Sequence, residues 1–502
     1  MPRPDPDTGV VFPRGEDGRR STTTAGRAVL ADALRAVDPA GADAVEAEKD
    51  WRSGYLRHVV ALTAAGARSA PAAVAVARAG LASVGTRMAL ATGGEERPLG
   101  TLLPRPSSEL ATEVVQGRGP RQRELVLPYR GEQLRGDALL RRLEQWEAAG
   151  TVEPSCAAIL SRLVAEPERL ELSGRAVAVL GAGAEMGPLG ALASWGASVV
   201  AVDVPSAKVW TRVLALAEAG AGTVTLPVRP GPGDLAGRAG ADLLTSAPEI
   251  AAWLTGVAPG RTLTVGSHAY ADGADHVRVA AAGDAVIASL LGSRPGTGYA
   301  ELATPTDAFV VPQDVVDDSR RRWAARGWRS TAQKPLQLLT RGALYAPAYT
   351  DEVPTDDGRR VGVADVLVPQ QGPNYALAKR LQRWRAVVAK DDGVQVSANV
   401  APATRTRSVT SNRLLAAAYS GAGRFGVEVF EPETSRVLMA ALLAADLTDP
   451  DAAGAPGRAL AHPDDLFVEG AAHGGLWRVP YSPRSVLGLA AGLGAPAMLR
   501  RG

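Results

Sequence analysis

Residues 175–203 are the part of the sequence that most restricts the fold of the chain. They read RAVAVLGAGAEMGPLGALASWGASVVAVD, in which a short apolar run rich in valine precedes a cluster of glycines. The glycines are Gly181, Gly183 and Gly187. A helix-length segment and a second apolar run follow, and that run ends at Asp203. Strand, glycine turn, helix, strand and acid is the order of a βαβ unit that binds a dinucleotide, so we expect an α/β protein built around this unit.

The chemistry of a dinucleotide gives each part of this unit a role. Glycines allow the backbone to approach a pyrophosphate closely, and the helix that follows offers free N–H groups and the positive end of its dipole. Glu185 and Met186 lie inside the turn and belong to the predicted cofactor site. Asp203 would accept hydrogen bonds from ribose hydroxyls, whereas Lys208 and Arg212 nearby would suit the 2′-phosphate of NADP. The alternative is an ordinary turn between a strand and a helix that binds nothing.

Composition restricts the class of protein further. A chain of 502 residues exceeds the usual size of a single core, so we expect two or more lobes. The hydrophobic fraction of 46% and the charged fraction of 22% are typical of a soluble globular protein, and the net charge of +2 argues against a nucleic-acid partner. The single cysteine, Cys156, excludes an intramolecular disulfide and fits a reducing compartment. Without a signal-like segment or an apolar run of the ~20 residues that span a bilayer, we expect a cytoplasmic protein with no membrane partner.

Hydrophobic periodicity divides the chain into three parts. Residues 1–20 mix proline, glycine and charges, which predicts a flexible tail. Residues 21–170 show helical spacing and predict a mainly helical lobe for interaction, lid closure or homo-oligomer formation. Residues 171–502 alternate strands with helices, which predicts a doubly wound parallel sheet of the Rossmann type, with an insertion at residues 294–357 and a helical C-terminal extension. Further strands are expected at residues 223–228, 242–245, 262–265, 364–368, 394–400 and 426–430.

A polar loop, residues 266–278, follows one of the expected strands. Ligands of open parallel sheets lie beyond the carboxyl ends of the strands, so this loop offers Ser267 and His268 to a small-molecule substrate. Its other polar side chains are Tyr270, Asp272, Asp275 and His276. The spacing of its His and Asp residues matches no metal pattern, so we expect no metal. Of the other histidines, His58 is expected to be structural and His473 to lie in a flexible surface loop.

A second informative stretch lies around residue 375. A helix is expected to carry Tyr375 and Lys379, which are four residues apart and therefore on one face. The sequence VQVSANVAP, residues 394–402, follows as a strand and leads to Thr404 and Thr406. A helix with Tyr-x-x-x-Lys followed by such a strand resembles the catalytic half of the short-chain dehydrogenases/reductases.

This resemblance extends loosely over residues 174–408 and implies roles for several of them. In that family the tyrosine exchanges a proton with a carbonyl or hydroxyl group, while the lysine holds the nicotinamide ribose and lowers the pKa of the tyrosine. By resemblance, Tyr375 would be the acid/base and Lys379 its partner. Pro402 and Thr404 would flank the nicotinamide and the phosphates. The implied cofactor is NAD or NADP.

The sequence also departs from the family pattern. Its glycine turn reads G-x-G-x-x-x-G, which is not the usual spacing of the family. Tyr375 follows Gly187 by 188 positions, which is longer than usual, so an insertion must loop out. The serine expected on the strand before the tyrosine is missing, with Gln370 or Gln371 in its place.

An alternative alignment leaves the location of the active site open. It makes Ser267 the family serine, and Ala280 and Asp284 then stand where the tyrosine and lysine belong. Under that alignment the active site would be degenerate. Tyr375 and Lys379 would then belong to an added element. A further alternative, in which neither residue has a catalytic role, is that Tyr375 packs at a helix–sheet junction and Lys379 is a solvated side chain.

These features lead to three hypotheses. The first is an NAD(P)-dependent oxidoreductase that moves a hydride to or from a carbonyl, alcohol or imine carbon of a small molecule, with Tyr375 handling the proton. Lys379, Ser267 and His268 complete the predicted catalytic set. The second is a dinucleotide-binding protein without turnover, acting as a sensor or scaffold. The third is a non-redox isomerase or lyase that uses the 266–278 loop on a different cofactor.

Overall fold

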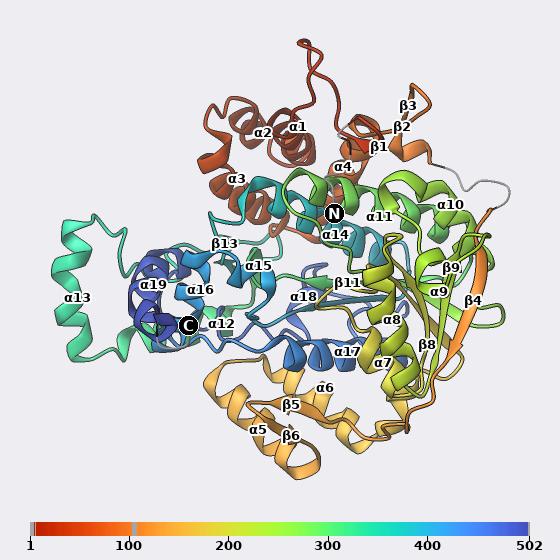
Figure 1. Ribbon diagram of the computed structural model, residues 1–502. Helices are drawn as coiled ribbons and strands as arrows, with labels where there is room; N and C mark the ends of the chain where they lie inside the picture. Colours follow the sequence, from red (N-terminus) through yellow and green to blue (C-terminus); the bar gives the residue numbers. More distant parts are fainter. Residues whose placement is uncertain (1–4, 6, 103–107, 500–502) are drawn as a thin grey trace.

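The computed structural model describes residue 5, residues 7–102 and residues 108–499. Its centre is a sheet of seven strands in the order β15-β11-β10-β7-β8-β9-β4 (Figure 1). Neighbouring strands are parallel, except that β4 pairs antiparallel with β9 at one edge. The strands are β4 (Ala111–Gln116), β7 (Arg175–Leu180), β8 (Ser198–Val202), β9 (Thr223–Val228), β10 (Thr262–Ser267), β11 (Gly298–Ala303) and β15 (Val396–Val400). The chain is therefore an α/β protein with a mixed, mostly parallel sheet.

Both faces of this sheet are covered, which explains the continuous apolar runs in the sequence. In β7, Ala176 and Ala178 point into the core on one face, and Val177 and Val179 point into the core on the other. Parallel strands that are buried on both faces are apolar at every position rather than at alternate positions. The α/β class predicted from the sequence is confirmed, with β4 as an antiparallel addition.

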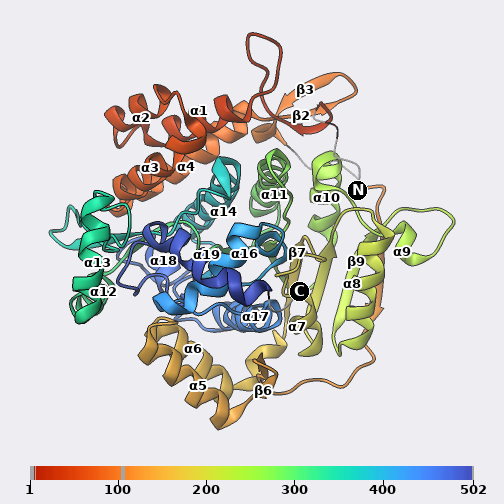
Figure 2. The ribbon, with the colours of Figure 1, turned by 60° about the vertical axis from the view of Figure 1, so that its left-hand side comes forward.

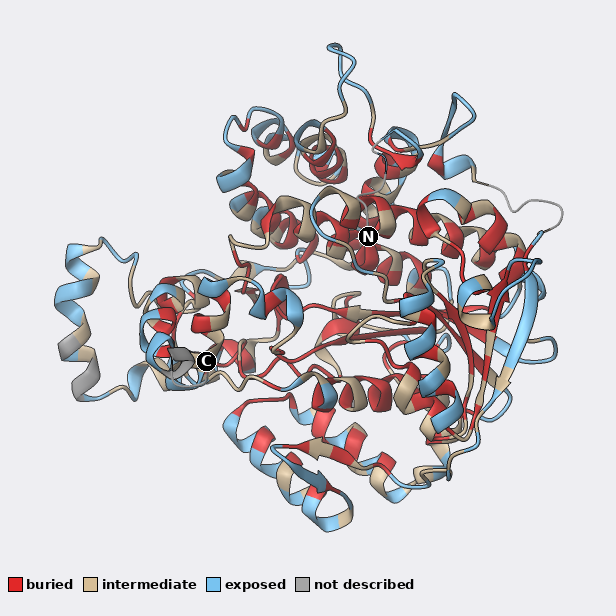
Figure 3. Cartoon of the chain, in the orientation of Figure 1, coloured by how far each residue is buried: buried red, intermediate tan, exposed pale blue. Residues whose placement is uncertain are grey.

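Helices form layers on the two faces of the sheet (Figures 1 and 2). On one face, α10, α11 and α14 pack against the strands, and α1, α3 and α4 cover them. On the other face lie α7, α8 and α17, with α5 and α6 beyond. Buried residues are concentrated in the sheet and on the inward faces of these helices (Figure 3). The helices are α1 (Thr22–Arg35), α3 (Trp51–Gly66), α4 (Ala70–Arg87), α5 (Gly136–Ala149), α6 (Pro154–Ala165), α7 (Leu189–Ser194), α8 (Ala207–Ala219), α10 (Leu243–Gly256), α11 (Ala274–Ser293), α14 (Gly372–Asp391) and α17 (Pro432–Thr448).

The N-terminal third differs from the expected tail and helical lobe. Its helices α1, α3 and α4 lie over one face of the sheet, β4 forms the sheet edge, and α5 and α6 lie beyond the other face (Figure 1). Residues 21–170 therefore share the core of the rest of the chain. Within the expected flexible tail, β1 (Gly9–Val11) is buried and pairs with β2 (Ala89–Thr92). The Arg278 guanidinium donates a hydrogen bond to the Val10 carbonyl at 2.6 Å, which fixes this strand to α11.

Two of the expected strands have other structures, and a third lies outside the central sheet. Residues 242–245 lead into α10, because the Asp242 carboxylate accepts a hydrogen bond from the Leu244 N–H at 2.9 Å and caps the helix. Residues 426–430 follow the short helix η3 (Ala422–Phe425) and contribute a bridge from Phe430 to Thr404. The strand expected at residues 364–368 is β14 (Arg360–Asp365), which lies in a separate sheet with β12 and β13.

The expected insertion at residues 294–357 begins later than predicted. Residues 298–303 form β11, which lies between β10 and β15 in the central sheet. The excursion from the sheet therefore begins after β11, and the chain returns through α14 to β15. It contains β12 (Ala308–Val311), α12 (Gln313–Ala324), α13 (Trp328–Leu339), β13 (Val353–Pro354) and β14.

The remaining elements lie at the edges of the molecule and in the C-terminal part. They are α2 (Pro39–Glu46), β3 (Glu95–Pro98), η1 (Leu99–Thr101), β5 (Leu127–Tyr129), β6 (Glu132–Leu134), η2 (Pro167–Glu171), α9 (Leu235–Arg238), α15 (Arg407–Thr410), α16 (Arg413–Gly421), α18 (Asp465–Val468) and α19 (Pro483–Leu499). None of the helices in the described part of the chain is long and apolar enough to cross a membrane.

Candidate functional site

The glycine turn after β7 meets the loop after β10 at the carboxyl edge of the sheet. Gly181 has a φ of +92°, and a Cβ atom at this position would lie 2.6 Å from the backbone of Ala269. Glycine is therefore required both by its backbone conformation and by the close approach of the second loop. The turn predicted to bind a cofactor and the loop predicted to bind a substrate lie side by side.

The Asp203 carboxylate is hydrogen-bonded to the glycine turn. Its Oδ2 accepts a hydrogen bond from the Gly183 N–H at 2.7 Å, and its Oδ1 accepts one from the Val204 N–H at 2.8 Å. The Arg212 guanidinium donates to the carbonyl of Gly183. Burial raises the pKa of Asp203 above its ordinary value, although the two N–H donors act in the opposite direction. The carboxylate predicted to bind ribose thus connects the end of β8 to the turn.

The helix after the glycine turn is short and begins late. Helix α7 has six residues and starts only after Pro188, so the expected helix N-terminus is not formed at the glycines themselves. Glu185 and Met186 lie in the irregular segment between them. The Glu185 carboxylate accepts a hydrogen bond from the Arg407 N–H at 2.9 Å, which joins the turn to the segment that follows β15. Met186 lines a small pocket beneath the turn.

The two stretches that the sequence left as alternatives meet at one place. Strand β10 ends at Ser267, and α14 passes beside it with Lys379 and Gln382. The Lys379 Nζ donates a hydrogen bond to the Gln382 Oε1 at 2.9 Å, and the Gln382 Nε2 donates one to the Ser267 Oγ at 3.0 Å. Ser267 and Lys379 therefore belong to one hydrogen-bonded chain rather than to competing sites.

Tyr375, one turn before Lys379 on α14, is bonded to a residue at the end of β11. Its hydroxyl donates a hydrogen bond to the Thr304 Oγ1 at 2.9 Å. The hydroxyl bonded to the tyrosine is therefore that of Thr304, and the Gln371 side chain, from the position of the missing serine, also lies near the phenol. Sequence reasoning missed Thr304 because β11 was counted in the insertion, so the residue after its carboxyl end was not considered.

The electrostatics of Tyr375 differ from what the resemblance implies. Burial raises the pKa of Tyr375, and the hydroxyls of Thr304 and Thr306 only partly oppose this effect. Within the described ranges, no hydrogen bond joins Lys379 to Tyr375. The lowering of the tyrosine pKa that was expected from Lys379 is not found, because the ammonium group is directed to Gln382 instead.

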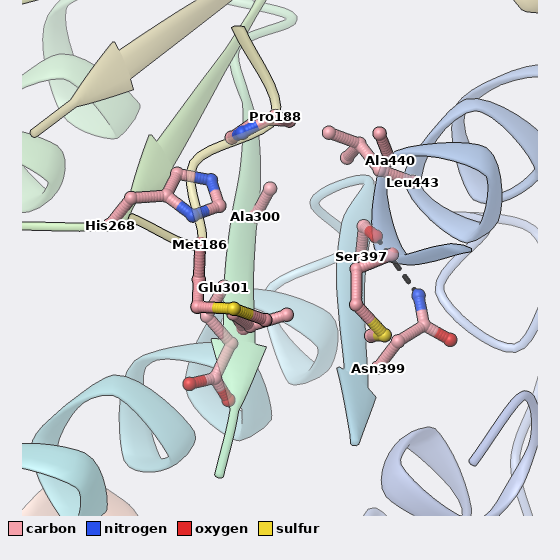
Figure 4. Close-up of a pocket in the computed structure, with 11 residues that line it drawn as sticks. Met186, Pro188, His268, Ala300, Glu301, Ser397, Asn399, Ala440 and Leu443 are labelled. Atoms are coloured by element: carbon pink, nitrogen blue, oxygen red, sulfur yellow. Dashed lines mark hydrogen bonds between the residues drawn. The ribbon is translucent and has the colours of Figure 1, made fainter. Parts of the chain in front are cut away.

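Glu301 of β11 is a charged residue of this site that sequence reasoning missed. Its side chain is buried, and in the described part of the chain neither carboxylate oxygen has a hydrogen-bond partner. Burial raises the pKa of Glu301 to about 7, and the charge of Lys379 opposes this shift. Glu301 is one of the residues that line a pocket together with His268 and Asn399 (Figure 4). The available signal was the single acid within the apolar sequence GYAELA of residues 298–303.

The two histidines of the 266–278 loop are uncharged at neutral pH. Burial lowers the pKa of His268 to about 4 and that of His276 to about 3, and the positive charge of Lys379 adds to both shifts. The His276 ring lies 5.4 Å from the Tyr375 ring and 4.7 Å from that of Tyr270. The His276 ring therefore lies against Tyr375, and the Tyr270 ring packs against His276. In the ranges that the structure describes, no group of three or more His, Cys, Asp or Glu residues could hold a metal ion.

Pro402 and Thr404 lie in the segment after β15 and are engaged with the protein itself. The Thr404 hydroxyl donates to the Pro402 carbonyl at 2.9 Å and lies 2.7 Å from the Ser435 hydroxyl. Thr404 is buried. These contacts attach the segment to α17, so Thr404 holds the backbone near the site in position.

Asp446 of α17 is buried behind the pocket and gives the chain a pH-dependent stability. Ser397 and Asn399 donate hydrogen bonds to its Oδ2, yet burial raises its pKa from 3.8 to about 7. A carboxyl whose pKa is raised on folding binds its proton more tightly in the folded chain. Its contribution to stability is therefore present below its ordinary pKa and is lost as the pH rises to about 7.

Replacing Asp446 with asparagine should remove this pH dependence while keeping an acceptor oxygen for Ser397 and Asn399. We expect the free energy of unfolding of Asp446→Asn, relative to the wild type, to increase by on the order of 3 kcal/mol between about pH 4 and about pH 8. Urea unfolding of both proteins at the two pH values measures this difference. An equal difference at both pH values would show that folding does not raise the pKa of Asp446.

His58 and His473 each lie against a buried carboxylate. His58 lies 3.1 Å from the Glu48 carboxylate in the N-terminal helices, as expected. His473 is completely buried, and its Nε2 lies 2.9 Å from the Glu153 carboxylate. The expectation of a flexible surface loop is wrong at His473, because Glu153 and Arg478 form a buried ion pair there.

No family model matches the chain, and no curated protein is significantly similar to it. The description of the site therefore depends on the sequence and the structure alone.

Proposed function

We propose that the chain is an NAD(P)-dependent oxidoreductase that transfers a hydride to or from a carbonyl or alcohol carbon of a small molecule. The observation that carries the proposal is the hydrogen bond from Tyr375 to Thr304 at the carboxyl edge of the sheet. A phenol held in one orientation by a neighbouring hydroxyl is a suitable proton donor or acceptor for a substrate oxygen. Lys379, on the same face of α14, supplies positive charge nearby.

The order of the strands supports a Rossmann-type nucleotide site. Without β4, the strands numbered along the chain lie in the order 6-5-4-1-2-3, which is that of doubly wound sheets that bind dinucleotides. Such sheets bind their ligand where the order reverses, which here is between β7 and β10. Gly181 and Gly183 lie at this point, and Asp203 follows β8, so these residues would hold the cofactor. Bound NAD(P) would supply or take up the hydride.

Within this proposal, the residues of the chain have distinct tasks. Tyr375 gives a proton to the substrate oxygen or removes one from it, and Thr304 fixes the direction of the phenol. The neutral rings of His268 and His276 limit the access of water. Lys379 would bind the ribose, as the resemblance implies, and the bond through Gln382 limits the positions it can take.

The second candidate is a dinucleotide-binding protein without turnover. It is favoured by the raised pKa of Tyr375 and by the bond of Lys379 to Gln382, which together leave the tyrosine weakly acidic. Fluorescence titration with NADH and NADPH tests the feature that both candidates share. No binding of either nucleotide at millimolar concentration would reject both, whereas binding without hydride transfer to any aldehyde or ketone would favour the second.

A methyl group at Gly183 should weaken nucleotide binding. The Cβ of Gly183→Ala would lie 2.7 Å from the Val209 Cγ1 and 3.2 Å from the Asp203 Oδ2, so the turn must move away from Val209 of α8 and its contact with Asp203 must loosen. We expect the Kd for NAD(P)H to rise about tenfold or more, since a loss of about 1.4 kcal/mol already corresponds to tenfold. The matched control is Gly190→Ala in α7, whose Cβ would be in ordinary contact with Leu216 at 3.6 Å. Equal affinity of the two variants would rule out binding at this turn.

A further inference from the structure

Helix α13 stands away from the rest of the molecule (Figure 1), and much of it is exposed (Figure 3). Leu336 is 42% exposed, Leu338 78% and Leu339 81%. The apolar side of a helix in a globular protein normally faces the core. These leucines face solvent instead.

The polar side of α13 is the side that contacts the protein. The Gln333 Nε2 donates a hydrogen bond to the Tyr481 hydroxyl at 2.9 Å, and the Gln337 Nε2 donates one to the Tyr345 carbonyl at 2.6 Å. At about 100° per residue, these glutamines lie on the side of the helix opposite Leu339. The helix is therefore held with its leucines directed outward, so its apolar surface is available to something outside this chain.

The charge around α13 indicates what covers this surface. Residues 319–350 contain no Asp or Glu. Of their seven basic residues, Arg320 pairs with Glu352, and Arg321 and Arg322 pair with Asp318. The other four are Arg326, Arg329, Lys334 and Arg341. Lys334 and Arg341, at and just beyond the C-terminal half of α13, are exposed, and within the described ranges neither forms an ion pair. An occupant of this surface must therefore be apolar where it meets the leucines and negatively charged around them.

We propose that α13 docks on the surface of a lipid bilayer that contains anionic headgroups. Leu336, Leu338 and Leu339 would enter the boundary between headgroups and acyl chains, and Lys334 and Arg341 would lie among the headgroups. A second copy of the chain fits less well, because twofold pairing through α13 would bring two acid-free basic segments together. The absence of a membrane-spanning helix in the described residues does not bear on this mode, since an interfacial helix lies along the surface.

Co-sedimentation of the full chain with vesicles tests the proposal. We expect binding to vesicles of phosphatidylcholine and phosphatidylglycerol in equal parts, little binding to phosphatidylcholine alone, and weaker binding as salt is raised. Leu338→Ser combined with Leu339→Ser should weaken binding about tenfold or more, and so should Lys334→Gln combined with Arg341→Gln. The matched control is Leu216→Ser, because Leu216 of α8 is also exposed but lies outside the basic segment. It should bind like the wild type.

Other results would overturn the proposal. Equal binding to both vesicle types would show that the basic residues do not contribute to binding. Unchanged binding of the Leu338→Ser, Leu339→Ser protein would show that α13 is not the docking element. Light scattering after gel filtration measures the oligomeric state and so tests the alternative of a second copy. A wild-type dimer that the two serine substitutions dissociate, with no vesicle binding, would assign the surface to a second copy. All substituted side chains are exposed, and thermal melts establish that each variant is folded.

Discussion

Tyr375→Phe is expected to lower turnover about 10²- to 10⁴-fold while leaving the affinity for NAD(P)H within about twofold of the wild type. The substitution removes the group proposed to transfer the proton and its bond to Thr304, but keeps the ring against His276. Initial rates of NAD(P)H oxidation with a panel of aldehydes and ketones provide the measurement. Thr304→Val should give a smaller loss of rate, since the phenol remains but is no longer held.

The matched control for Tyr375→Phe is Tyr349→Phe. The Tyr349 hydroxyl is also buried and donates a hydrogen bond, here to the Trp477 carbonyl at 2.7 Å, but it lies outside the proposed site. Its loss should cost about 1 kcal/mol of stability and leave turnover unchanged. If Tyr375→Phe retains full turnover, the tyrosine is not the acid/base and the oxidoreductase proposal loses the observation that carries it.

Asp307→Ala is expected to lower the free energy of unfolding by about 3–5 kcal/mol, because it leaves two buried guanidinium groups without their shared carboxylate. The Arg380 guanidinium donates to the Asp307 Oδ1 at 2.6 Å, and that of Arg383 donates to the Oδ2 at 2.9 Å. All three side chains are buried. Burial alone would raise the pKa of Asp307, but the two positive charges outweigh it and hold this pKa below its ordinary value.

This ion-pair cluster also links stability to the candidate site. Asp307 follows β11 closely, and Arg380 and Arg383 belong to α14, so the cluster holds the helix of Tyr375 against the strand that leads to Thr304. Urea unfolding measures the effect, and Asp43→Ala is the control, because Asp43 pairs with Arg35 at the surface and should contribute less than about 1 kcal/mol. Similar losses of unfolding free energy in Asp307→Ala and Asp43→Ala would mean that the buried cluster contributes no more to stability than a surface ion pair does.

Sequence patterns predicted the parallel part of the sheet well where local signals were strong. The run before Gly181 and the run before Asp203 are β7 and β8, since apolar strands bounded by glycine and an acid have few other stable structures. Prediction failed at residues 242–245, because the Asp242 side chain caps a helix and the apolar residues that follow belong to α10. It also failed at β11, because Pro295 and Gly296 just before it, Gly298 at its start and Pro305 just after it are typical of a loop.

The candidate site could be predicted only in part, because its residues come from separate segments. Ser267, His268, Tyr375 and Lys379 were all identified from the sequence, but as members of two competing loops. Their meeting depends on β10 lying next to β11 and on α14 returning over that pair after a long excursion. No local pattern encodes such an arrangement, since it results from burial of both faces of the sheet.

The sequence by itself determined the glycine turn, because Gly181 must adopt a positive φ and Asp203 must end the next strand wherever the rest of the chain lies. The tertiary structure alone decided which groups surround Tyr375. Thr304 and Glu301 lie beside α14 because β11 takes the position between β10 and β15, and the pKa of each buried group follows from that position. Sequence patterns specify local backbone geometry, whereas the environment of a side chain is set by residues distant along the chain that packing brings near.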